Sequence, residues 1–100
     1  MTTVHIENTV QDFGTWKANF DKFERFRAEQ GVLSYRVSRS LTEPNEVLID
    51  LEFSDETAAQ AFLPKLKQIM STPQAQAQLI RHSAPRLYAI VTERVPSAAG

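Results

Sequence analysis

Residues 46–53 read EVLIDLEF, a run in which apolar and mixed positions alternate with a period of two. The odd-numbered positions are all apolar: Val47, Ile49, Leu51 and Phe53. The even-numbered positions are mixed: Glu46, Leu48, Asp50 and Glu52. Because successive side chains of a strand point to opposite faces, this pattern predicts a strand with one face buried under helices. Its second face is half polar and needs a separate explanation.

Two further strands are predicted on the N-terminal side of this run. Residues 32–41 alternate in the same way, with Leu33, Tyr35 and Val37 on one side, and the turn-prone residues 43–45 (EPN) join them to the run as a hairpin. Residues 3–8 place the β-branched Val4 and Ile6 on one side and therefore predict the first strand.

The longest helix of the chain is predicted between the first two strands. Asp12 is a candidate N-cap, and Gly31 is a candidate residue just beyond the C-terminus. The apolar spacing changes to a helical stripe of aromatic residues that ends in a cation: Phe13, Trp16, Phe20, Phe23 and Arg27. We expect this stripe to pack on the apolar face of the sheet.

The second crossover is expected to be segmented. Pro64 and Pro73 interrupt the helical pattern, so we predict helical pieces over 55–63, 64–70 and 73–81. His82 is expected at the end of the last piece, where a cation caps the helix by complementing its dipole. A last strand follows over 87–91, and residues 95–100 (VPSAAG) are expected to form a flexible C-terminal tail. The order βαββαβ predicts one α+β ferredoxin-like domain over 1–94, an antiparallel four-stranded sheet with both helices on one face.

The uncovered sheet face favours a homodimer. The last strand lies at a sheet edge, yet it carries apolar residues on both sides. Covering Leu48, Tyr88 and Ile90 from two chains would contribute several kcal/mol at roughly 25 cal/mol per Å² of apolar surface. Face-to-face pairing of two chains is the simplest cover, although a ligand or another protein would also serve.

Composition narrows the classes of function. The 11 basic and 12 acidic residues give a net charge of -1, which argues against nucleic acid as a partner. The chain has no cysteine, so disulfides and thiolate chemistry are excluded. No apolar run approaches the roughly 20 residues of a membrane span, and no basic region followed by an apolar run opens the sequence. We therefore expect a cytoplasmic protein without a membrane partner.

The chain also resembles a known group of proteins. The pattern Trp16-x₃-Phe20-Asp21-x₅-Arg27-x₃-Gly31 is its most specific part. It continues in Tyr35-x₃-Arg39 and in the runs 43–47 (EPNEV) and 51–53 (LEF). Over residues 4–92 the sequence is similar to the dimeric α/β-barrel superfamily, in particular to small bacterial antibiotic-biosynthesis-monooxygenase-like proteins. The resemblance implies a ferredoxin-like monomer whose sheet packs against its twin.

The resemblance does not imply one reaction, since the superfamily includes cofactor-free oxygenases, haem-degrading enzymes, isomerases and members without assigned activity. Asn8 stands where relatives often have His, and Trp16 is on a different element from the Trp of the haem-degrading members. Haem chemistry is therefore not carried over, and we expect no bound cofactor.

Arg27 is the most informative candidate for a site residue, because helical projection places this cation inside the aromatic stripe. In one interpretation it is structural, burying its stem and reaching solvent or a carboxylate such as Asp50 or Glu52. In the other it binds the carboxylate or enolate oxygen of a ligand. Trp16, Phe20 and Phe23 would then be the ligand-binding wall, or else plain core.

Proton transfer has three candidates: His5, Asn8 and Tyr35. His5 and Glu7 share one face of the first strand, and the structural interpretation makes them part of a wet dimer interface. Two ligands in His5-x-Glu7 do not make a metal site, so none is expected.

Two functions remain open. The first is a cofactor-independent, monooxygenase-like or isomerase- or cyclase-like enzyme that acts on an aromatic or polyketide-like substrate. The alternative is a non-catalytic dimeric protein that binds a small ligand or a protein.

Overall fold

The computed structural model describes residues 1–97. Its elements follow the order β1 (Thr2–Val10), α1 (Phe13–Asp21), α2 (Glu24–Glu29), β2 (Ser34–Arg39), β3 (Glu46–Phe53), α3 (Glu56–Met70), α4 (Pro73–Gln78), β4 (Leu79–His82) and β5 (Arg86–Ala89). The sheet order is β2-β3-β1, with β4 and β5 both pairing with the outer side of β1, and every pairing is antiparallel. The predicted α+β ferredoxin-like fold is confirmed.

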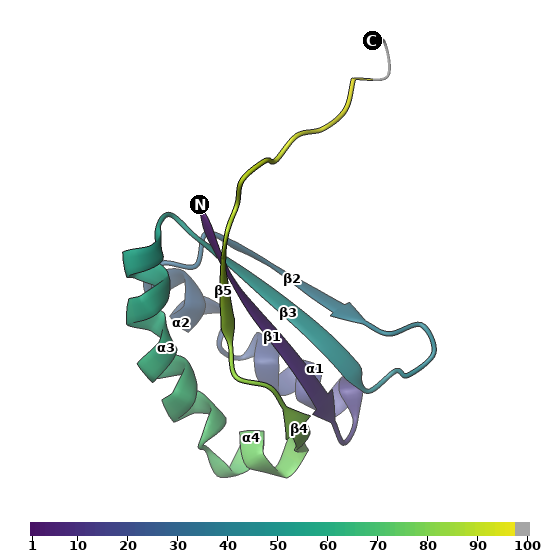
Figure 1. Ribbon diagram of the computed structural model, residues 1–100. Helices are drawn as coiled ribbons and strands as arrows, with labels where there is room; N and C mark the ends of the chain where they lie inside the picture. The colour runs from purple at the N-terminus through teal and green to yellow at the C-terminus, as the bar shows by residue number, and fades with distance from the viewer. Residues whose placement is uncertain (98–100) are drawn as a thin grey trace.

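The core lies between the helices and one face of the sheet. Figure 1 shows the helices on one side of the strands. The odd-numbered apolar residues of β3 (Val47, Ile49, Leu51 and Phe53) are all buried, and they are joined by Val4 and Ile6 of β1 and by Phe62 of α3. Phe53 and Phe62 pack with their ring centroids 5.4 Å apart. This is the burial that the period-two pattern predicts.

The first helix is broken, whereas one continuous helix was predicted. Asp12 caps α1 as expected, accepting from the Thr15 amide at 2.9 Å. At the other end, the amide of Phe23 donates to the carbonyl of Phe20 at 3.2 Å, a tight turn that ends α1 before α2 begins. Gly31 has a φ of 94°, in the region that favours glycine, and follows α2 as predicted.

The predicted interruption at Pro64 is wrong, because α3 runs from Glu56 through Pro64 to Met70. Proline removes the hydrogen bond to the carbonyl four residues earlier, which belongs to Gln60. Both Pro64 and Gln60 are exposed, so water can bind the freed carbonyl and the helix continues. α3 is therefore the longest helix, whereas the sequence predicted that the longest helix would lie between the first two strands.

The predicted helix over 73–81 is also too long. It ends at Gln78, and residues 79–82 form β4 against Asn8–Val10, with an irregularity between Thr9 and Val10. His82 is therefore a strand residue and not a helix-capping cation. The predicted last strand over 87–91 is observed as β5, which begins one residue earlier, at Arg86, and ends two residues earlier, at Ala89. Pairing with the free edge of β1 overrides the local helical tendency of residues 79–81.

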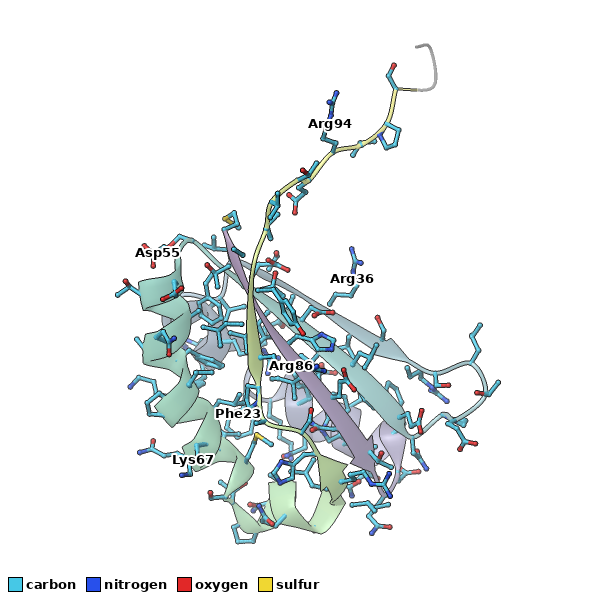
Figure 2. All side chains as sticks on the ribbon, viewed as in Figure 1. Phe23, Arg36, Asp55, Lys67, Arg86 and Arg94 are labelled. Atoms are coloured by element: carbon cyan, nitrogen blue, oxygen red, sulfur yellow. The ribbon has the colours of Figure 1, made fainter. Side chains whose placement is uncertain are left out.

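The chain beyond β5 leaves the body of the molecule. Figure 1 shows this segment running away from the sheet, and Figure 2 shows Arg94 on it, clear of the helices. Of the predicted tail over 95–100, residues 95–97 have no helix or strand, and residues 98–100 lie outside the described residues. Within residues 1–97, no helix combines the length and the apolar character needed to cross a membrane.

Candidate functional site

A cavity of about 90 Å³ lies between the helices and the buried face of the sheet. Its wall combines residues from both crossovers and from the two central strands: Ile6, Asn8, Trp16, Asn19, Phe20, Phe23, Arg27, Ile49, Leu51, Phe62, Leu66, Ile69, Met70, Ala75 and Leu79. Five of the predicted site residues therefore meet at one place. A mostly apolar wall with a few polar groups is typical of small-molecule sites.

Arg27 is a buried cation without a carboxylate partner. Its residue is 5% exposed, and its Nη1 donates to the Phe20 carbonyl at 2.9 Å. Its Nε and Nη2 are buried and have no hydrogen-bond partner. The suggested pairing with Asp50 or Glu52 is wrong, because these carboxylates lie on the other sheet face, where they bind His5 and Thr3. A buried charge without a partner costs folding free energy, which makes it a candidate for ligand binding.

Two aromatic rings partly compensate this charge. The guanidinium carbon of Arg27 lies 3.7 Å from the ring centroid of Phe20 and 4.8 Å from that of Tyr35. The Tyr35 hydroxyl donates to Glu24 at 2.8 Å, and Tyr35 is not among the residues around the cavity. Tyr35 thus contacts Arg27 but does not line the cavity itself.

Asn8 brings a second polar group to the cavity. It is 8% exposed, and its Oδ1 is buried without a hydrogen-bond partner. β1 directs Asn8 to the helix side, because the alternation of the strand puts it on the same face as Ile6. Arg27 and Asn8 therefore offer free donors and a free acceptor on the same wall.

The aromatic stripe forms much of the remaining wall. Trp16 and Phe20 stack with centroids 5.1 Å apart and planes inclined by 29°. Trp16 is buried, whereas Phe20 and Phe23 are half-buried. These rings present flat apolar surface beside the Arg27 side chain, which suits a planar ligand.

His5 lies on the opposite face of the sheet, away from the cavity. Its Nδ1 is 2.6 Å from Asp50 Oδ1, and its Nε2 is 3.0 Å from Glu7 Oε2. Arg86 also donates to Glu7, at 2.6 Å. Only the doubly protonated imidazole can donate to both carboxylates. The hydrogen bond to Asp50 raises the pKa of His5, burial opposes this, and Glu7 adds to the rise.

The raised pKa of His5 predicts a fall in stability at alkaline pH. The His5 contribution is fully present below its unfolded pKa, near 6.5, and is lost as pH rises through the higher folded pKa. In denaturant unfolding of the wild type, the free energy of unfolding should fall between pH 6 and pH 9. In His5→Gln this dependence on pH should be weaker. His82→Gln is the matched control, since His82 is exposed on β4. An identical pH profile for His5→Gln and the wild type would contradict this assignment.

The sequence interpretation missed the helix-side residues that follow Pro64. Leu66, Ile69 and Met70 have helical i, i+3, i+4 spacing and line the cavity. The predicted helical piece over 64–70 contained them, but none of them was named as a site residue. Leu79 was assigned to a helix and reaches the cavity from β4. Asn19 of α1 is a further polar residue that lines the cavity, and no sequence pattern marked it as a site residue. Among residues 1–97, no group of three acidic or histidine side chains is placed to hold a metal ion.

The fold and the cavity define a small ferredoxin-like domain with an aromatic internal site. Residues 1–65 match the model of the antibiotic biosynthesis monooxygenase family. This is more than half of the chain, so the protein belongs to that family. A search of the curated proteins finds no match.

Several solved structures share the fold. SnoaB, a cofactor-independent oxygenase from Streptomyces nogalater, is similar with a TM-score of 0.67 and 15% identity, over 96% of this chain and 97% of that chain. A dimeric ferredoxin-like protein from an uncultured marine organism gives a TM-score of 0.67 at 7% identity, over 96% of this chain and 92% of that chain. A second dimeric ferredoxin-like protein from an uncultured marine organism gives a TM-score of 0.62 at 13% identity. The match covers 93% of this chain and 96% of that chain. At these identities the likeness establishes the architecture alone.

Proposed function

We propose that the protein binds an oxygen-bearing aromatic molecule in the cavity and oxygenates it with molecular oxygen, without a bound cofactor. The observation that carries this proposal is the buried Arg27 guanidinium, with two nitrogens, Nε and Nη2, that have no hydrogen-bond partner on the wall of an aromatic cavity. Membership of the monooxygenase family supports the reaction class. The fold shared with SnoaB, described as a cofactor-independent oxygenase, adds to that support.

The reaction needs an electron-rich anion of the substrate. A deprotonated phenol or enol can transfer an electron to oxygen, and the two radicals can then combine at a ring carbon. Breakdown of the resulting peroxide leaves one oxygen atom in the product, and the other leaves as water with two hydrogens from the substrate. Arg27 would stabilise the anion, Trp16 and Phe20 would stack on the ring, and Asn8 Oδ1 would accept the hydrogen bond of a substrate hydroxyl. His5 has no part in this reaction, because it lies on the other sheet face.

Oxygen uptake tests the reaction. We expect chelator-treated protein to consume oxygen with a panel of hydroxylated aromatic compounds. Each product should contain one oxygen atom more and two hydrogen atoms fewer than its substrate. Removing a donor to a developing anion typically costs 100-fold or more, so Arg27→Met should lower kcat/KM by about that factor. Arg25→Gln is the control, because Arg25 is exposed and pairs with Glu29 at 3.2 Å.

The outcomes separate the two candidate functions. A compound that binds in the cavity without oxygen uptake would favour the non-catalytic binding protein. Full activity in Arg27→Met would place the reaction elsewhere on the molecule.

We further propose that two chains pair through the open face of the sheet. This face carries Leu48 (40% exposed) and Tyr88 (48% exposed) beside the His5 network. The segment beyond β5 adds exposed Val91 and Val95, and it extends away from its own body (Figure 1). The two marine proteins with this fold are described as dimeric. An apolar surface of this kind is typical of an interface.

A further inference from the structure

The geometry of the free groups restricts the chemistry of the ligand. Arg27 uses Nη1 for the Phe20 carbonyl and leaves Nε and Nη2 without a partner. Nε–H and one N–H of Nη2 point the same way along one edge of the planar guanidinium. Two parallel donors on one edge match the two oxygens of a carboxylate better than the single oxygen of a phenolate.

The charge balance of the cavity also calls for an anion. Among the described residues around the cavity, none is acidic, and Arg27 is the one cation. A second free group, Asn8 Oδ1, needs a hydrogen-bond donor. Both residues are more than nine-tenths buried, so bulk water does not satisfy these atoms. A ligand that satisfies both residues carries a carboxylate and a hydroxyl.

The size of the cavity favours a ligand with one ring. An apolar cavity of about 150 Å³ in another protein takes up benzene. The cavity here is smaller, about 90 Å³, and Met70 on its wall is a flexible side chain that can move aside. One ring therefore requires a modest side-chain adjustment, and fused rings require a larger one.

We infer that the cavity binds a single-ring hydroxy-aromatic carboxylate, with the carboxylate on the free edge of Arg27 and the hydroxyl on Asn8. This inference rests on the proposed function for the reaction, but not for binding. It differs from a polyketide-like substrate in ring number, and it places the charge on the carboxylate and the reacting oxygen near Asn8.

The single tryptophan of the chain gives a direct readout, because Trp16 lines the cavity. Benzoate and the neutral, nearly isosteric benzamide are titrated under anaerobic conditions, and Trp16 fluorescence is followed. We expect wild-type protein to bind benzoate at least about 10-fold more tightly than benzamide, since one such factor corresponds to a single charge-assisted contact. Arg27→Met should remove this preference. Arg25→Gln should keep it.

Two further variants refine the assignment. Arg27→Lys keeps the charge but loses the two-donor edge, so we expect an intermediate preference for benzoate. Among the three hydroxybenzoate isomers, at least one should bind more tightly than benzoate in the wild type. Asn8→Leu should abolish that gain, so that this variant binds the hydroxybenzoate no more tightly than benzoate. If Arg27→Met fails to fold, Arg27→Lys and Asn8→Leu still test both contacts.

Clear results would overturn the inference. The first is equal affinity for benzoate and benzamide. The second is a change in Trp16 fluorescence with chloride or acetate equal to that with benzoate at the same concentration. The third is tighter binding of a naphthoate than of benzoate. Binding of hydroxybenzoate without oxygen uptake would support the inference while contradicting the proposed oxygenation. Oxygenation of a neutral, multi-ring compound alone would do the reverse.

Discussion

Arg27→Met should make the ligand-free protein more stable while it removes ligand binding. The substitution replaces a buried cation, whose Nε and Nη2 have no partner, with an apolar side chain of similar length. Replacing poorly compensated buried charges by apolar residues often raises stability by about 1 kcal/mol or more. The lost contacts with Phe20 and Tyr35 offset part of this gain. We expect a net rise of about 1 kcal/mol in the free energy of unfolding.

Urea unfolding of the ligand-free protein measures this effect. The Phe20 carbonyl keeps a partner in the variant, because the Phe23 amide also donates to it. Arg27→Ala is the matched comparison, and it should lose about 2 kcal/mol because it leaves a void. A loss of stability in Arg27→Met as large as that in Arg27→Ala would instead make Arg27 a structural residue that holds the turn between α1 and α2.

Tyr88→Glu should dissociate the proposed dimer. Tyr88 lies at the open sheet face, exposed by 48%, with its ring edge-to-face with His5 at 6.1 Å. Tyrosines at interface centres commonly contribute 2 kcal/mol or more, so the dissociation constant should rise by about 30-fold or more. The added carboxylate would also lie near Glu7 and Asp50, which form the His5 network.

Analytical ultracentrifugation over a range of protein concentrations gives the dissociation constant. Ala18→Glu is the control, because Ala18 is an exposed residue of α1, on the helix side of the sheet. The control should remain dimeric. A wild type that is monomeric at high concentration, or a Tyr88→Glu variant that still forms dimers, would contradict pairing through this face.

The sheet could be predicted from the sequence because its signal is local. The bounds of β3 were predicted without error, and the alternation of β1 and β3 correctly separated buried from open positions such as Val4 and His5. The second crossover could not be predicted as well. Continuation of α3 through Pro64 depends on solvent at Gln60, and β4 depends on the free edge of β1. Both are tertiary effects that periodicity does not contain.

The candidate site was predicted in part. Helical projection placed Arg27 beside Phe20 and Trp16, and all three line the cavity. The break between α1 and α2, and with it the Phe20 carbonyl that holds one nitrogen of Arg27, had no signal in the sequence. His5 and Asn8 were grouped as candidates, yet the alternation of β1 sends them to opposite faces. The roles of these residues in catalysis stay predictions.

The most direct test of the central claim is a crystal structure of the protein with a bound hydroxybenzoate. We predict a single aromatic ring in the cavity beside Trp16, with the carboxylate on Nε and Nη2 of Arg27 and the hydroxyl on Asn8 Oδ1. A ring bound instead on the open face beside His5 and Tyr88, or a cavity closed by its own side chains at saturating ligand, would contradict the assignment of this site.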